Sequence, residues 1–138
     1  MSTPVGVPQG ISDSLAPSSA LETGPLTSLG REVVVDAHGC DPALLRSVDT
    51  LKRLFDRVID ELDLRPVDQC WHQFPEPGGV TGMVLLSESH LTVHTFPEHG
   101  TATFNLYCCR PRPDWPWAAR LQETIGAVSA DVRTFSRG

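Results

Sequence analysis

The sequence predicts an α+β domain, a two-layer α/β sandwich in which two helices cover one face of a mostly antiparallel sheet. Three observations indicate this class. Short β-rich runs recur along the chain, a long amphipathic helical pattern follows the first of them, and a shorter one precedes the last. The predicted order is therefore β-α-β-β-β-β-α-β. At 138 residues, the chain is long enough for one domain with one hydrophobic core.

The chain divides into an N-terminal segment and a folded domain. Residues 1–28 are rich in Pro, Ser, Thr and Gly without periodicity, which predicts a disordered tail. The predicted domain is 29–138, and its first strand, 32–38, is rich in valine. The next segment, 41–62, begins with Asp and Pro, which is typical of a helix start. Its apolar residues recur at helical spacing, which predicts a single helix of about five turns.

The remainder of the domain is mostly strand. A short helix is predicted at 117–125, where apolar residues recur at i, i+4 spacing before Gly126, and a last strand is predicted at 128–135. The strands between the two helices are predicted at 64–74, 80–86, 89–96 and 101–109.

The run 101–109 alternates cleanly and therefore has two different faces. Cys108 belongs to the apolar face, whereas Cys109 belongs to the more polar face, together with Thr103, Asn105 and Tyr107. The predicted helices would leave this polar-leaning face uncovered. We therefore expect a second subunit to cover it.

Composition excludes several functional classes. The net charge is −6 and the basic residues are scattered, so nucleic-acid binding is not expected. No apolar run approaches the roughly 20 residues that span a bilayer, and the N-terminus lacks a signal-peptide pattern. A cytoplasmic protein without membrane association is therefore expected. The only lysine, Lys52, lies within a helical pattern, which is an unsuitable position for a pyridoxal phosphate Schiff base.

The cysteines and tryptophans are expected to have mainly structural roles. A cytosolic chain would keep its four cysteines reduced. Cys40 and Cys70 are predicted to be buried thiols. Trp115 and Trp117 are predicted to be core or interface anchors.

Reactive side chains concentrate in the stretch 87–98, which holds two serines, two histidines and two glutamates. Hydrolysis by a catalytic triad would require a Gly-x-Ser-x-Gly turn, which does not surround Ser89. Metal binding is an alternative, although the spacing matches zinc sites poorly; the candidate ligands are His90, His94, Cys108 and Cys109.

A third chemistry is self-cleavage of the backbone. The Ser89 hydroxyl attacks the carbonyl carbon of Glu88 and converts the amide to an ester. A base then removes the α-proton of residue 89, and β-elimination leaves a terminal pyruvoyl group. Such a group supplies an electrophilic carbonyl to a chain without a suitably placed lysine.

The stretch 85–98 resembles the processing-site motif of the prokaryotic S-adenosylmethionine decarboxylase proenzymes. The resemblance extends from about Gly30 through the last strand. Flanking segments at family-like positions are 30–31, 39–41, 79–82 and 107–109.

This resemblance implies roles for the central residues. Cleavage would fall between Glu88 and Ser89, giving a β chain that ends at Glu88 and an α chain that starts with a pyruvoyl group, the only cofactor expected. The pyruvoyl group would form a Schiff base with the substrate amine. His94 matches the histidine that accepts the α-proton during processing. Cys109 matches the cysteine that returns a proton to the substrate carbon, and no metal or pyridoxal phosphate is implied.

The resemblance also implies supporting residues. Thr81 falls where the family has a serine hydroxyl used in processing, and His90 is expected to support the motif. Glu98 matches a carboxylate that binds the ribose hydroxyls of S-adenosylmethionine. Phe96 and Phe74 are candidate substrate contacts, although Phe96 could equally be a core residue.

The implied function is decarboxylation of S-adenosylmethionine to supply aminopropyl groups for spermidine and polyamine biosynthesis, by a homodimer of αβ protomers. Three departures concern the substrate pocket: Phe96 replaces a tryptophan, Asn105 an acidic residue and Arg110 a small residue. They leave open arginine or ornithine as the substrate of the same chemistry. An unprocessed, non-catalytic ligand- or partner-binding paralogue is the alternative from another class.

Overall fold

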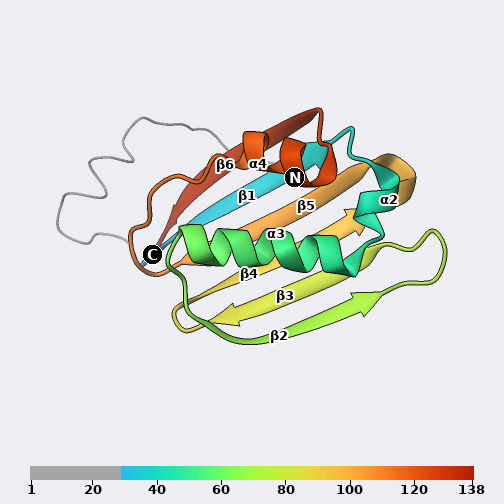
Figure 1. The fold of residues 1–138 in the computed structure, drawn as a ribbon. Coiled ribbons are helices and arrows are strands. Elements are labelled where there is room, and N and C mark those ends of the chain that lie inside the picture. Colours follow the sequence, from blue (N-terminus) through green and yellow to red (C-terminus); the bar gives the residue numbers. More distant parts are fainter. Residues whose placement is uncertain (1–28) are drawn as a thin grey trace.

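The computed structural model describes residues 29–138, which form two layers, a six-stranded sheet and a layer of helices (Figure 1). All neighbouring strands are antiparallel, and their order across the sheet is β2-β3-β4-β5-β1-β6. This confirms the predicted α+β class. The predicted tail, 1–28, lies outside the described residues. The strands are β1 (Gly30–His38), β2 (Pro66–Gln73), β3 (Val80–Leu86), β4 (Ser89–Phe96), β5 (Thr101–Cys108) and β6 (Ser129–Arg137).

The helices lie on one face of the sheet (Figure 1). They are α2 (Pro42–Leu45), α3 (Val48–Glu61) and α4 (Trp117–Ile125), with a 3-10 turn, η2 (Pro97–His99), after β4. As predicted, α4 ends at Gly126, which adopts a left-handed conformation with φ of 72°.

The prediction of one continuous helix over 41–62 is wrong, because the chain breaks into α2 and α3. The Asp41 carboxylate caps α2 by accepting a hydrogen bond from the Ala43 amide at 2.9 Å. A second cap follows at Ser47, whose hydroxyl accepts a hydrogen bond from the Thr50 amide at 3.1 Å. A capping serine starts a new helix by satisfying one of its free amides. The break was not predicted because the apolar residues keep helical spacing across it.

The core fills the space between the helices and the inner face of the sheet. Phe55 of α3 packs against Phe104 of β5, with ring centroids 6.3 Å apart, and Phe104 packs against Trp117 of α4 at 5.7 Å. Trp115 and Trp117 are both buried, which confirms that they belong to the core. Burial of such large rings is a major source of stability in a domain of this size.

The two cysteines predicted to be buried differ. Cys40 is 5% exposed, as expected, but Cys70 is exposed, so the prediction for Cys70 is wrong. β2 is an edge strand that pairs only with β3, and nearly all of its residues are exposed. The periodicity of a strand does not reveal whether it lies at an edge.

The outer face of the sheet has no helix against it within residues 29–138 (Figure 1). Along β4, the inward residues Leu91 and Val93 are fully buried, whereas His94 and Phe96 are exposed. β5 alternates in the same way, with its polar-leaning set only half-buried. The predicted uncovered face therefore exists, and we call it the open face.

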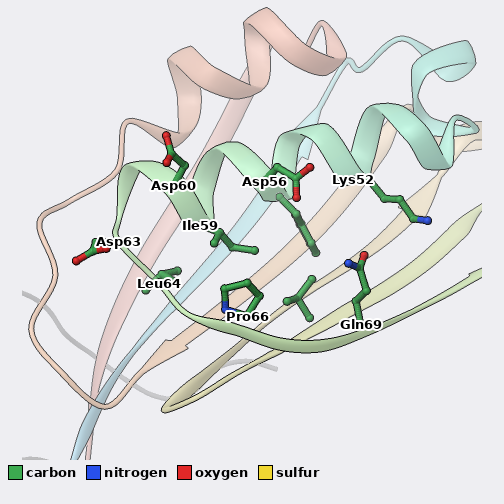
Figure 2. Close-up of a pocket in the computed structure, with 10 residues that line it drawn as sticks. Lys52, Asp56, Ile59, Asp60, Asp63, Leu64, Pro66 and Gln69 are labelled. Carbon is green, nitrogen blue, oxygen red and sulfur yellow. The ribbon is translucent and has the colours of Figure 1, made fainter.

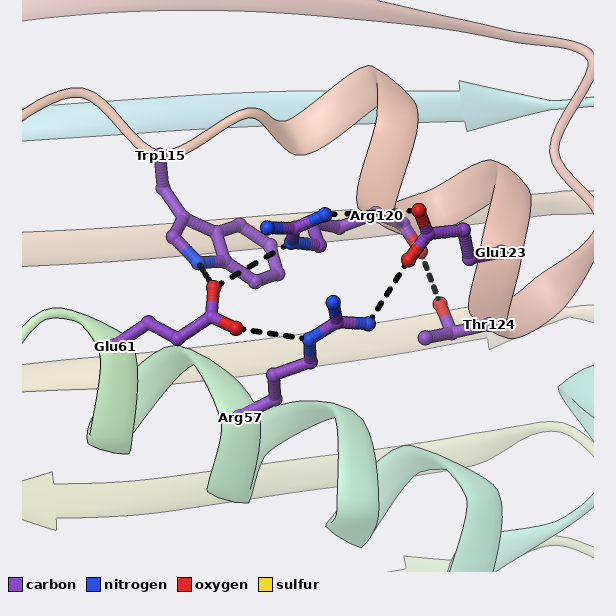
Figure 3. Close-up of polar contacts among 6 residues, drawn as sticks. All are labelled: Arg57, Glu61, Trp115, Arg120, Glu123 and Thr124. Atoms are coloured by element: carbon purple, nitrogen blue, oxygen red, sulfur yellow. Dashed lines mark hydrogen bonds and ion pairs between the residues drawn. The ribbon is translucent and has the colours of Figure 1, made fainter.

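A polar network around Glu61 holds the segment before α4 against α3 (Figure 3). The Glu61 carboxylate accepts hydrogen bonds from Arg57 Nε at 3.0 Å and from Trp115 Nε1 at 2.8 Å, and Arg120 Nε lies 3.4 Å away. Arg57 also donates to Glu123 of α4 at 3.0 Å. The hydrogen bonds from Arg57 and Trp115 hold the pKa of Glu61 below its usual value of 4.5.

We expect the Glu61→Ala variant to melt at a lower temperature than the wild type, and Glu61→Gln to lose less, since glutamine still accepts the indole hydrogen bond. The carboxylate's contribution is fully present above its unfolded pKa and is lost as the pH falls through its lower folded pKa. The difference in melting temperature between the wild type and Glu61→Gln should therefore shrink between about pH 6 and about pH 3. Thermal melts across this range test it, and a constant difference would contradict the ionic role.

Candidate functional site

The Glu88–Ser89 peptide bond lies at a tight turn between β3 and β4. Leu86 pairs with Ser89, so only Ser87 and Glu88 form the loop. The Ser87 amide donates a hydrogen bond to the Arg65 carbonyl oxygen at 2.9 Å. Ser89 is half-buried at the start of β4, and its place in the alternation is that of Leu91 rather than that of His94. The junction therefore lies where strands β3 and β4 end, and not in the middle of the sheet.

Cys109 lies beside this junction because Ser89 pairs with Cys108 across β4 and β5. The Cys109 amide donates a hydrogen bond to the Glu88 carbonyl oxygen at 3.2 Å. Attack on that carbonyl would place negative charge on its oxygen, and a backbone donor aimed at it stabilises such charge. Cys109 is thus adjacent to the bond that sequence analysis predicts to be cleaved.

The two adjacent cysteines have different environments, as the alternation predicted. Cys108 is 8% exposed, and burial raises the pKa of its thiol above the usual 9.0. Cys109 is exposed and lies one residue beyond the end of β5, so the predicted strand was one residue too long. A thiol must be accessible to exchange a proton with a bound molecule. Cys109 meets this condition and Cys108 does not.

An ion pair at the junction was not predicted from the sequence. The Arg110 guanidinium Nε lies 2.5 Å from the Glu88 carboxylate, and a hydrogen bond from Arg110 holds the pKa of Glu88 below its usual range. Arg110 was noted only as a departure from the family pattern. The sequence carries no signal for this pair, because the pair depends on the alignment of Ser89 with Cys108 across β4 and β5.

His94 lies toward the other end of β4, beside Thr81 of β3. The Thr81 hydroxyl and His94 Nδ1 are 3.1 Å apart, and the two residues are cross-strand partners. The next residue, Thr95, is a buried anchor: its hydroxyl accepts a hydrogen bond from the Val80 amide at 2.9 Å and donates to the Leu45 carbonyl oxygen at 2.8 Å. The backbone of His94 is therefore firmly held, while its ring is exposed on the open face.

The predicted substrate contacts lie at the His94 end of the sheet. Phe96 is 40% exposed on the open face and is therefore not a core residue. Phe74 is 50% exposed, and its ring contacts His72 edge-to-face with centroids 4.6 Å apart. Glu98 is exposed in the turn η2 that follows β4. Two exposed aromatic rings and an exposed carboxylate therefore lie at the same end of the sheet as His94.

His90 belongs to the Ser89 end. Its ring stacks on Tyr107 of β5, with centroids 5.7 Å apart and planes at 16°. Tyr107 in turn covers Gly30, where a β-carbon would lie 2.2 Å from the tyrosine hydroxyl. Tyr107 was not singled out from sequence, although His90 and Tyr107 are cross-strand partners with the same outward alternation.

The structure therefore separates the candidate residues into two groups on one chain. The cleavage group consists of Glu88, Ser89 and Cys109, and the histidine group consists of Thr81 and His94. Ser89 and His94 are five residues apart on one extended strand, which corresponds to about 16 Å. Direct proton transfer requires about 3 Å. Within a single chain, His94 cannot reach residue 89.

The alternative of a metal site gains no support. His94 lies at the far end of β4 from Cys108 and Cys109, and Cys108 is buried on the opposite face. Residues 29–138 contain no group of three or more His, Cys, Asp or Glu side chains arranged to hold a metal ion.

No helix within residues 29–138 is both long and apolar enough to span a membrane.

A surface cleft lies elsewhere, between α3 and the edge strand β2 (Figure 2). Lys52, Asp56 and Asp60 border it from the helix, while Pro66 and Gln69 border it from the strand. It contains none of the candidate residues. The candidate chemistry therefore lies at the sheet and its turn, outside this cleft.

Comparison with solved structures first defines the class of protein. The fold is similar to that in the crystal structure of the adenosylmethionine decarboxylase from Aquifex aeolicus, with a TM-score of 0.66 and 30% identity. The match covers 80% of this chain and 92% of that one. The domain thus has the two-layer fold of that decarboxylase.

Sequence comparison identifies the family. The family model S-adenosylmethionine decarboxylase matches residues 31–138. The S-adenosylmethionine decarboxylase proenzyme of Thermosipho africanus is 37% identical over 115 residues, 82% of this chain and 87% of that protein. That of Shouchella clausii is 33% identical over 114 residues, 82% of this chain and 88% of that protein. The chain belongs to the S-adenosylmethionine decarboxylase family.

Proposed function

We propose that the chain is a self-processing, pyruvoyl-dependent decarboxylase that acts on S-adenosylmethionine and supplies aminopropyl groups for spermidine synthesis. The observation that carries this proposal is the Glu88–Ser89 junction, whose carbonyl oxygen accepts a hydrogen bond from the amide of Cys109. Relatives that share the domain are named proenzymes, which accords with cleavage of a precursor.

Self-processing begins at Ser89. Its Oγ adds to the carbonyl carbon of Glu88, the C–N bond breaks, and the hydroxyl proton passes to the nitrogen, so that an ester replaces the amide. A base then takes the α-proton of residue 89, and the bond between Cβ and the ester oxygen breaks. Glu88 leaves as a carboxylate, and hydrolysis of the remaining enamine by water releases ammonia. We assign the base to His94, whose Nδ1 lies beside the Thr81 hydroxyl.

The residues at the junction fit the pyruvoyl group that this reaction would form. Residue 89 would become a chain terminus at the margin of the sheet, half-buried and next to the exposed Cys109. When present, the group supplies an electrophilic carbonyl that withdraws electrons from the substrate's α-carbon. We assign to Cys109 the return of a proton to that carbon after carbon dioxide leaves.

A homodimer would unite the two groups of residues. Suppose that two copies pack with their open faces together and are related by a two-fold axis perpendicular to the strands. The Ser89 end of each copy then lies over the His94 end of the other copy. Each site would then take Ser89 and Cys109 from one copy and His94 from the second. Large apolar side chains on the open face are 40–50% exposed and suit such packing: Phe74, Met83, Leu85 and Phe96.

The departure at Asn105 is compatible with S-adenosylmethionine as the substrate. Asn105, which replaces an acidic residue of the family pattern, donates a hydrogen bond to the Glu32 carboxylate at 2.5 Å. Burial raises the pKa of Glu32, but the hydrogen bonds from Asn105 and Arg137 outweigh it and lower the pKa overall. An ionised carboxylate is therefore retained on the neighbouring strand.

Release of labelled carbon dioxide tests the reaction. Purified, processed protein should release it from carboxyl-labelled S-adenosylmethionine, and not from arginine or ornithine tested in parallel. The uncleaved Ser89→Ala variant is the control and should release none. Release from arginine or ornithine only would show that the amino acid, and not S-adenosylmethionine, is the substrate. If the processed protein released carbon dioxide from none of the three, the proposed function would be contradicted.

A further inference from the structure

We propose that Arg110 is a positioning residue for self-cleavage: its ion pair with Glu88 holds the scissile carbonyl on the Cys109 amide and within reach of Ser89. This inference rests on the proposed self-processing function. It concerns a residue at which this chain departs from the family pattern, and a contact that arises only in the folded chain.

The turn that carries the scissile bond depends on contacts from outside. Two-residue hairpin loops usually adopt conformations with positive φ, which match the twist of the strands. Neither Ser87 nor Glu88 has a positive φ. The loop is held by the Ser87 amide on the Arg65 carbonyl, by the Cys109 amide on the Glu88 carbonyl, and by the Arg110–Glu88 pair at 2.5 Å. Of these three contacts, only the Arg110–Glu88 pair is formed by two side chains.

The segment that presents Arg110 is anchored. Arg31 donates to the Arg112 carbonyl oxygen at 3.3 Å and pairs with Asp114 at 2.5 Å. Trp115 is buried and bonded to Glu61, as described above. Exposed ion pairs usually contribute little stabilising free energy, because ordering two long side chains costs conformational entropy. A fixed backbone at one end of the pair reduces that cost.

Charge supplies a second reason for the pairing. Attack by Ser89 puts negative charge on the Glu88 carbonyl oxygen, close to the carboxylate of the same residue. An unpaired carboxylate would repel this charge, whereas the paired one is neutralised by Arg110. Arg65 and Arg112 add to the positive field that Glu88 experiences. The elimination step places a further carboxylate at residue 88, which the same field favours.

The test measures the rate of cleavage of freshly translated, full-length chains by intact mass or gel. We expect Arg110→Ala to slow cleavage about two- to fivefold, the range of an exposed ion pair, and Arg110→Lys to stay within about twofold of the wild type. Arg53→Ala, which removes an exposed arginine from α3, is the matched control and should cleave at the wild-type rate.

A double-mutant cycle shows whether Arg110 acts through Glu88. Glu88→Ala/Arg110→Ala should cleave no more slowly than Glu88→Ala alone, since alanine offers Arg110 neither an acceptor nor a charge. An additional slowing equal to that in the wild-type background, or an Arg110→Ala rate equal to that of the wild type, would overturn the inference. Failure of the wild type to cleave would instead overturn the proposed function, so the two outcomes are distinguishable.

Discussion

Replacement of Ser89 by alanine is expected to leave the protein as one uncleaved chain of about 15.0 kDa. The wild type should separate under denaturing conditions into residues 1–88 and 89–138, with the second fragment blocked at its N-terminus. Alanine lacks the oxygen that must attack the Glu88 carbonyl, so no ester forms and the backbone stays intact. Intact-mass measurement distinguishes these outcomes directly.

A neighbouring serine provides the control for this prediction. Ser87 lies in the same turn and is held through its backbone amide, by the bond to the Arg65 carbonyl. Ser87→Ala should therefore still cleave at Glu88–Ser89. A wild-type protein that stays whole would favour the non-catalytic paralogue, and cleavage of Ser89→Ala would show that another residue is the nucleophile.

Co-expression of Ser89→Ala chains with His94→Ala chains is expected to restore cleavage that neither variant shows alone. In a mixed dimer, one site combines Ser89 of the His94→Ala chain with His94 of the other chain. If the two chains associate at random, about half of the His94→Ala chains should be cleaved. Different tags on the chains allow mass spectrometry to identify the fragments.

The control for the mixing experiment replaces the helper chain with Ser89→Ala/His94→Ala. No histidine is then available to the His94→Ala chain, and it should remain whole. If the single-variant helper also fails to restore cleavage although mixed dimers form, the base does not come from a second copy. The separation of about 16 Å along β4 would then require another base within the same chain.

Much of the fold follows from local patterns. The bounds of β3 and β4 agree with the runs predicted from residue type, because alternation and β-branched content act within a single strand. The different environments of Cys108 and Cys109 follow from the same alternation. The break at Ser47 was missed, since a capping serine inside an apolar pattern resembles an ordinary polar position of a helix.

The candidate site was likewise predictable from the sequence only in part. Its residue types and the cleavage junction are recognisable in the stretch 85–98, because the reaction requires particular groups in a fixed order along the chain. Their distribution in space is not recognisable there. The sequence brings Ser89 and His94 within five positions, yet an extended strand turns that short interval into a long distance.

By itself, the sequence determined the class of fold, the alternation of each strand and the residues able to carry out the chemistry. Only the tertiary structure decided that β2 is an edge that exposes Cys70, that Arg110 pairs with Glu88, and that the Ser89 and His94 groups lie at opposite ends of one sheet. The physical reason is that side-chain periodicity is a local property of the backbone, whereas neighbours in a sheet depend on which strands pair and in which register.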